Sequence, residues 1–206
     1  MGLYANHILP WLIDRACSAE PVARQREKVV PLAEGTVLEI GIGSGLNLPY
    51  YDAAKVEKVI GLDPAEEMLA KARARAAAVA FPVEHLALAG EEIPLDGNSV
   101  DTVLVTYTLC TIVDVAAALS GMRRVLKDGG RLIFCEHGLA PDAGVRRVQN
   151  LINPFWRRIG GGCNVNRDIP GLLLEGGFAI DSLDTMYLPG TPRFGGFNYW
   201  GTARVG

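Results

Sequence analysis

The chain has 206 residues, of which 49% are hydrophobic and 21% are charged, and its formal net charge at pH 7 is −3. This composition is typical of one soluble globular domain and excludes a disordered or fibrous chain. A slightly acidic chain lacks the basic face that duplex binding normally needs, so nucleic acid is not expected as its main partner.

The first half of the chain alternates between predicted helices and strands. Apolar residues at helical spacing predict a helix over residues 4–17, and Pro21 is suited to the first turn of a second helix. Two β-branched runs, residues 36–40 and 58–62, predict the first two strands. Residues 64–80 form the clearest helix, with glutamates in its first turn and basic residues further along.

The second half continues this alternation. Strands are expected over residues 82–88, 100–105, 131–135, 179–186 and 199–205. Between them the sequence predicts a helix over 114–126, a turn over 127–130, and a helical segment over 143–176 that is broken by three glycines at 160–162. This order predicts a doubly wound α/β sheet with parallel crossovers. We expect a single domain over residues 1–206, with a helical cap over 1–33 and a Rossmann-like core over 34–206.

No targeting or membrane-spanning segment is evident in the sequence. The apolar run at residues 8–13 is short, contains Pro10 and has no basic leader, unlike a secretory signal. No stretch approaches the ~18 apolar residues of a membrane span. We therefore expect a cytoplasmic protein, and nothing in the sequence indicates its oligomeric state.

The four cysteines are Cys17, Cys110, Cys135 and Cys163. They form no C-x-x-C pair and no Cys/His cluster with the spacing of a zinc site. The sequence therefore predicts free thiols, as in a reducing compartment, and no metal site.

A glycine-rich loop follows the first strand and reads Glu39-Ile40-Gly41-Ile42-Gly43-Ser44-Gly45. Glycines at alternate positions allow a sharp turn and a close approach by a ligand. Asp63 ends the second strand, where a carboxylate can accept hydrogen bonds from both hydroxyls of a ribose. Asp63 could also cap the helix that begins at Pro64.

A dinucleotide is the alternative ligand for this loop. Pyrophosphate binding favours G-x-G-x-x-G, in which the third glycine lets the next helix pack closely. Here Gly45 comes one position early and Pro49 interrupts the start of the helix. A ligand without phosphates is therefore the better fit.

Four ordered segments together resemble the class I S-adenosylmethionine-dependent methyltransferases. They are residues 37–45, 63–72, 96–101 and 124–132. The resemblance implies S-adenosylmethionine as the cofactor and S-adenosylhomocysteine as the product. It also implies a seven-stranded sheet in the order 3-2-1-4-5-7-6, with the seventh strand antiparallel.

The resemblance also assigns cofactor-binding residues. Gly41, Gly43 and Gly45 would line the methionine and ribose, and Glu39 would support the ammonium end of the methionine.

Residues near the ribose and adenine follow from the same resemblance. Asp63 would hold the ribose hydroxyls, with Pro64 and Met68 near the adenine. Many family members then use an Asp-Ala-Glu sequence whose aspartate accepts from the adenine amino group. This chain has Ala89-Gly90-Glu91 instead, so Glu91 or a backbone carbonyl is expected there.

Candidate reacting groups lie after the fourth and fifth strands. Methyl transfer is an in-line displacement, so alignment and desolvation are the main tasks, and a base is needed only for a protonated acceptor. His137 is the candidate base, and Glu136 could orient it or act alone; His137 could equally be a structural hydrogen-bonding residue. Tyr107 is either a pocket wall or a core aromatic, and Cys110 is expected to pack.

A narrower resemblance is to the methyltransferase-like seven family. Residues 108–110, 135–137, 153–156 and 162–167 carry it. It implies an alkyl thiol as the acceptor, which needs only a modestly basic neighbour because its pKa is about 8.5. The chain departs from that family in a glycine-rich aromatic tail after Pro189 and in the expected lack of a long N-terminal anchor.

Three functions follow from these observations. The first is methylation of a small molecule, with thiols as the first class. The second is methylation of a quinone-like ring or a phospholipid amine, and the third is S-adenosylmethionine binding without catalysis. The N-terminal helix around Trp11 could cap the acceptor pocket or make a peripheral membrane contact.

Overall fold

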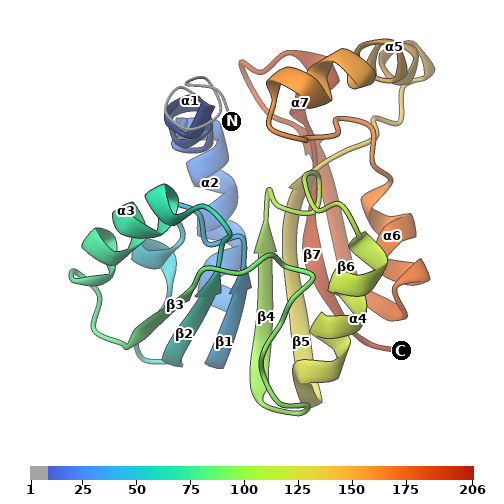
Figure 1. Ribbon diagram of the computed structural model, residues 1–206. Coiled ribbons are helices and arrows are strands. Elements are labelled where there is room, and N and C mark those ends of the chain that lie inside the picture. The colour runs from blue at the N-terminus through green and yellow to red at the C-terminus, as the bar shows by residue number, and fades with distance from the viewer. Residues whose placement is uncertain (1–8) are drawn as a thin grey trace.

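Seven strands form one sheet in the order β3-β2-β1-β4-β5-β7-β6 in the computed structural model, which describes residues 9–206 (Figure 1). The strands are β1 Gly35–Ile40, β2 Val56–Leu62, β3 Val83–Leu86, β4 Val100–Thr106, β5 Leu126–His137, β6 Phe178–Tyr187 and β7 Phe197–Val205. Strands β1 to β5 pair in parallel, and β7 runs antiparallel to both of its neighbours. The predicted fold class and strand order are therefore confirmed.

Helices cover both faces of this sheet. They are α1 Leu9–Cys17, α2 Glu20–Val29, α3 Glu66–Ala76, α4 Val115–Val125, α5 Ala143–Ile159, α6 Ile169–Glu175 and α7 Arg193–Gly196, with 3-10 turns at Val30–Leu32 and Leu48–Tyr50. Residues 4–8 of the predicted first helix lie outside the described residues. No helix within residues 9–206 is both long and apolar enough to cross a membrane.

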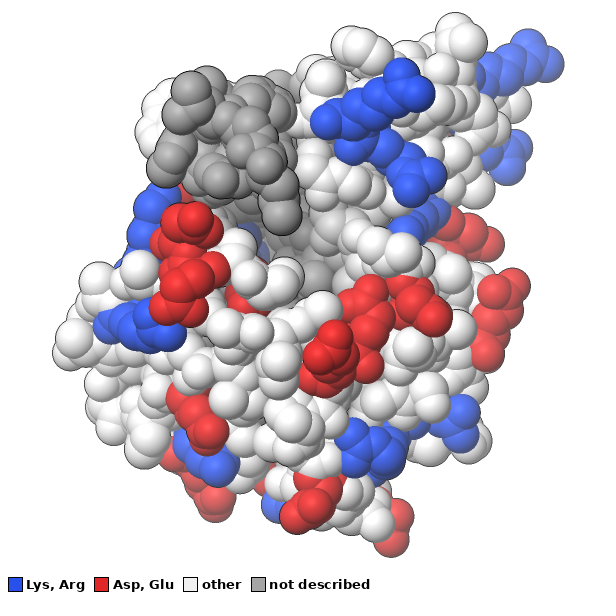
Figure 2. Space-filling model, viewed as in Figure 1, with Lys and Arg blue, Asp and Glu red and all other residues white. Residues whose placement is uncertain are grey.

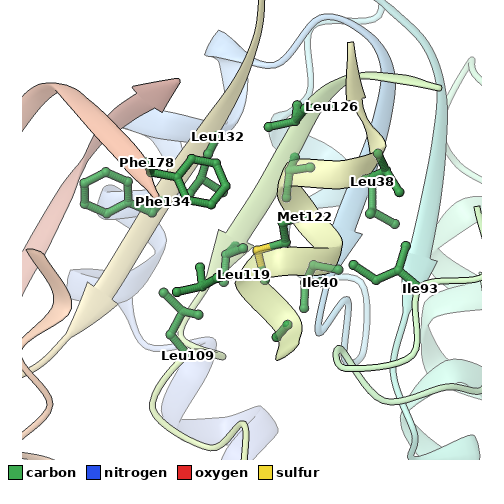
Figure 3. Close-up of a cluster of buried hydrophobic side chains, with 14 of the residues drawn as sticks. Leu38, Ile40, Ile93, Leu109, Leu119, Met122, Leu126, Leu132, Phe134 and Phe178 are labelled. Atoms are coloured by element: carbon green, nitrogen blue, oxygen red, sulfur yellow. The ribbon is translucent and has the colours of Figure 1, made fainter. Parts of the chain in front are cut away.

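Two apolar clusters hold the layers together. One packs Leu119 and Met122 of α4 against the sheet, with Ile40 of β1 and Phe134 of β5 beside them (Figure 3). The other packs α2 and α3 against the opposite face. Strands β1 and β4 contribute to both clusters, which explains their nearly continuous apolar runs.

The fifth strand begins earlier than expected. The predicted turn at 127–130 is wrong, because these residues belong to β5 and form an irregularity in its pairing with β4. Lys127 Nζ lies 2.8 and 2.9 Å from the two carboxylate oxygens of Asp101, which ties the irregular stretch to β4. Gly129 takes a positive φ of 79° there.

The other predicted elements differ mainly at their ends. The helix expected over 64–80 is shorter, and the segment expected over 143–176 divides into α5 and α6 at the predicted glycine break. The short helix α7 was not predicted. The parallel strands end toward the top of Figure 1, where α1 and α5 lie.

Candidate functional site

A cavity of about 480 Å³ lies beyond the carboxyl ends of β1, β2 and β4. This is a size typical of small-molecule sites. In Figure 2 the face shown is hollowed near its centre, with acidic side chains beside the hollow. The cavity is lined by eight of the predicted site residues, namely Gly41, Gly43, Asp63, Pro64, Met68, Gly90, Glu91 and Tyr107.

The glycines of the first loop have different tasks. Gly41, Gly43 and Gly45 all have positive φ, at 72°, 54° and 78°. A Cβ on Gly43 would face the cavity, 3.7 Å from Met68 Cε. A Cβ on Gly45 would instead approach Leu48 Cδ1 at 2.9 Å, and Gly45 is not part of the lining. Of these three glycines, Gly43 is therefore the one at which a side chain would mainly fill the cavity.

Asp63 is joined to this loop. Its Oδ2 accepts a hydrogen bond from the Gly43 N–H at 3.0 Å, and its Oδ1 accepts from the Ala65 N–H at 2.9 Å. Burial raises the pKa of this carboxyl. Each carboxylate oxygen can accept a second hydrogen bond, so both can still receive a ribose hydroxyl. The N-cap of α3 is Ala65 and not Asp63.

Glu39 lies beneath the loop and does not line the cavity. Its Oε1 accepts from Asn47 Nδ2 at 2.8 Å and its Oε2 accepts from the Tyr51 hydroxyl at 2.6 Å. Asn47 Oδ1 in turn accepts from Arg26 Nε at 2.9 Å, and both Asn47 and Arg26 line the cavity. The structure therefore places Asn47 between Glu39 and the cavity, so Glu39 could support a methionine end only through Asn47.

Burial raises the pKa of Glu39 to about 7, from an ordinary value of 4.5. Between these values the folded chain holds a proton that the unfolded chain has released, so the free energy of unfolding falls as the pH rises. Glu39→Gln has no carboxyl to ionise at this position. Its free energy of unfolding should therefore fall less steeply with pH than that of wild type, by about 1 kcal/mol per pH unit.

Urea unfolding of the ligand-free protein between about pH 5 and pH 7 measures this difference. Glu57→Gln is the matched control, because Glu57 is an exposed glutamate of β2. If plots of the free energy of unfolding against pH were parallel for wild type and Glu39→Gln, Glu39 would be ionised throughout this range.

Glu91 lines the cavity but already has protein partners. Its Oε1 accepts from the N–H groups of Val113 and Asp114, at 3.1 and 3.2 Å, and so holds the chain that leads into α4. A Cβ on the adjacent Gly90 would lie 2.8 Å from Ile40 Cγ2, so any side chain there would require Ile40 to shift. An adenine contact from Glu91 stays a prediction.

Tyr107 forms a wall of the cavity directly after β4. Its φ is 54°, a strained conformation for a residue other than glycine. Its hydroxyl donates to Asn198 Oδ1 at 2.7 Å, and the Arg26 guanidinium lies 5.6 Å from the ring centroid. The pocket-wall interpretation of this residue therefore agrees with the structure.

Helix α1 covers part of the cavity. Ile13, Asp14 and Cys17 are in its lining. The Asp14 carboxylate accepts a hydrogen bond from the Ser44 hydroxyl and lies 3.3 Å from Lys71 Nζ, so it joins α1 to the glycine loop and to α3. This arrangement supports the interpretation of α1 as a cap.

The two predicted catalytic residues do not line the cavity. Glu136 is buried, and its Oε1 accepts from the N–H groups of Thr108 and Leu109, at 2.7 and 3.0 Å. Burial raises the pKa of Glu136 to about 7. His137 points to the loop between α5 and α6, where its Nε2 lies 3.3 Å from Cys163 Sγ. Glu136 therefore supports the cavity wall from behind, and a catalytic role for this pair stays a prediction.

Cys110, His137 and Cys163 form a cluster that the sequence did not predict. A hydrogen bond from Cys110, opposed by burial and assisted by His137, lowers the pKa of Cys163 to about 4. Burial alone would lower the pKa of His137, but the contact with Cys163 raises it above its ordinary value. The three residues come from separate segments, so no local spacing in the sequence could have revealed them.

Comparisons with known proteins agree with this geometry. A family model described as a methyltransferase domain matches residues 38–134. Thiol S-methyltransferase TMT1B of Rattus norvegicus is 32% identical over 139 residues, which cover 66% of this chain and 56% of that protein. Phosphatidylethanolamine N-methyltransferase of Cereibacter sphaeroides is 29% identical over 128 residues, covering 61% and 62%.

Solved structures share the fold. A SAM-dependent methyltransferase from Thermotoga maritima superimposes with a TM-score of 0.67 at 22% identity, covering 98% of this chain and all of that chain. The chain spans less than two thirds of the length of each of these two curated relatives.

Proposed function

We propose that the chain is a class I S-adenosylmethionine-dependent methyltransferase that transfers a methyl group from this cofactor to a small-molecule acceptor, with thiols as the first class. The observation that carries the proposal is the direct bond between the Gly43 N–H and the Asp63 carboxylate inside one cavity. This bond places the glycine loop after β1 and the Asp63 carboxylate after β2 side by side, so that one ligand can contact both.

The residues present fit this cofactor. Asp63 offers acceptors for the ribose hydroxyls, and Pro64 and Met68 give an apolar side for the adenine. Asn47 and the backbone after Gly41 line the same cavity, and we assign them to the methionine end. When bound, S-adenosylmethionine supplies a methyl group on a positively charged sulfur, and the protein's task is to align it with the acceptor and exclude water.

The acceptor side of the cavity has a different character. Ile13 and Cys17 of α1, Thr111 and Val113 after β4, and Gly161 before α6 line it. These five residues are uncharged, while the charged Asp14 and Arg26 of the same lining are held by Ser44 and Asn47. A neutral, soft acceptor such as an alkyl thiol suits them, and the 32% identical relative is named for thiol methylation.

An acceptor panel with a methyl-labelled cofactor tests the proposal. Wild-type protein should methylate a short alkyl thiol, and His137→Ala should lower kcat by about 10-fold or more, if His137 acts on the acceptor proton. Unchanged kcat in this variant would remove His137 from the reaction. Tight cofactor binding without turnover on any acceptor would instead support a sensor.

A second candidate is methylation of a quinone or a phospholipid amine. Exposed apolar side chains on α5 favour it: Leu151 is 82% and Phe155 64% exposed. Arg157 and Arg158 follow on the same helix and suit an anionic surface. Turnover on such acceptors in the panel, with none on thiols, would select this candidate. A cytoplasmic location with peripheral membrane contact stays part of the proposal.

A further inference from the structure

Three metal-binding side chains converge behind the wall of the cavity. Cys110 follows β4, His137 ends β5, and Cys163 lies between α5 and α6. Their Sγ and Nε2 or Nδ1 atoms all lie within 4.8 Å of one another, and His137 Nε2 is 3.3 Å from Cys163 Sγ. Zinc bonds of about 2.0–2.3 Å in a tetrahedron place ligand atoms roughly 3.5–4 Å apart. Small side-chain rotations therefore suffice to bring all three onto one ion.

We infer that Cys110, His137 and Cys163 form a three-ligand zinc site. Two sulfurs and one imidazole are the donors that zinc prefers, whereas magnesium and calcium need oxygen ligands. The carboxylate of Glu136, the residue before His137, uses Oε1 for the two backbone N–H groups after β4. Two thiolates and a neutral imidazole would also balance the charge of the ion.

The backbone holds these ligands in place without an ion. The Asn164 N–H and its side-chain amide both donate to the Cys110 carbonyl, each at 2.9 Å, so the loop that carries Cys163 is fixed to the segment that carries Cys110. Gly161 and Gly162 take positive φ values of 63° and 91°, which allows the tight turn before Cys163.

A buried amide fixes the third ligand segment. Gln149 of α5 is fully buried, and its Nε2 lies 3.0 Å from the Gly138 carbonyl and 2.7 Å from the Val165 carbonyl. These carbonyls are next to His137 and close to Cys163. A site held by such bonds is organised before the ligand arrives, which favours metal binding.

Three protein ligands leave one tetrahedral position open, as in catalytic zinc sites. Thr111 and Gly161, which are close in sequence to Cys110 and Cys163, line the cavity. With zinc bound, an acceptor thiol that reached the fourth position from the cavity would lose its proton to solvent and would be held as the nucleophilic thiolate. This role of the ion rests on the proposed function; the metal site itself does not.

Metal content of the purified full chain tests the site. Protein incubated with zinc under reducing conditions and then desalted should retain about one zinc ion per chain. Cobalt in place of zinc should give the intense visible bands of a tetrahedral site with thiolate ligands. In Cys110→Ser and Cys163→Ser, zinc affinity measured against a chromophoric chelator should fall by more than the ~10–100-fold that loss of an outer partner costs.

Cys135→Ala is the matched control, because Cys135 is a buried cysteine of β5 that does not belong to the cluster. It should keep both zinc and the cobalt spectrum, and circular dichroism checks that every variant is folded. The inference is overturned if wild-type protein retains no more zinc than the folded Cys110→Ser variant. A Cys110–Cys163 disulfide in the reduced, zinc-treated protein would overturn it as well.

Activity separates this inference from the proposed function. If the protein binds zinc but methylates no thiol, the metal site stands and the thiol acceptor is wrong. If thiol turnover survives complete removal of zinc by a chelator, the proposed function stands and the ion has no role in holding the acceptor.

Discussion

Asp63→Ala is expected to weaken the binding of S-adenosylmethionine by about 100-fold or more. The proposed ribose contact consists of two charge-assisted hydrogen bonds, each worth ~1.5–3 kcal/mol, and this variant would lose both. The variant also loses the bonds from the Asp63 carboxylate to the N–H groups of Gly43 and Ala65, which shape the cofactor loop. Isothermal titration calorimetry measures the change in Kd.

Two further variants make this result specific. Asp63→Asn keeps an oxygen acceptor but loses the charge, so its Kd should lie between those of wild type and Asp63→Ala. Glu66→Ala removes an exposed carboxylate from the first turn of α3 and should leave the Kd unchanged. An unaltered Kd in Asp63→Ala would refute the ribose contact and, with it, the assignment of the cavity.

Gly43→Val is expected to abolish cofactor binding. A Cβ at this position would lie 3.7 Å from Met68 Cε and 3.9 Å from Asp63 Oδ2, so a valine would fill the cavity rather than a gap in the core. Its φ of 54° is also a costly conformation for a β-branched residue.

Control variants separate the two effects of Gly43→Val, which are backbone strain and obstruction of the cavity. Gly129→Val is the matched control, since Gly129 has a φ of 79° and a Cβ there would meet nothing within 4 Å. It should cost stability but retain binding, while Gly43→Ala should bind weakly in a folded protein. Wild-type affinity in Gly43→Ala and Gly43→Val would mean that the ligand does not approach this loop.

Local patterns were sufficient to predict the strands. Parallel strands buried on both faces leave apolar runs such as residues 36–40 and 100–105, and those runs are strands in the structure. The strand order came from the family resemblance, because spacing along a chain does not determine which strands pair. The start of β5 was missed because its glycines are also typical of a turn.

The residues of the candidate site were harder to predict. Asp63 and the glycines stand next to strand ends, where motifs are informative, whereas Arg26 reaches the cavity from a helix that carries no motif. Glu136 and His137 are consecutive residues of a strand and therefore face opposite sides of the sheet. That alternation gives the two side chains different partners, and their catalytic role stays a prediction.

Arg26 connects the start of the chain to the cofactor loop. Its Nε donates to Asn47 Oδ1, and its Nη1 donates to the Cys17 carbonyl at the end of α1, 2.6 Å away. Free-energy coupling between two such regions is equal in both directions. We therefore expect a nucleoside that orders the loop to slow amide hydrogen exchange in α1 and α2. A change that loosens these helices should in turn raise the dissociation constant of the ligand, with the same coupling free energy.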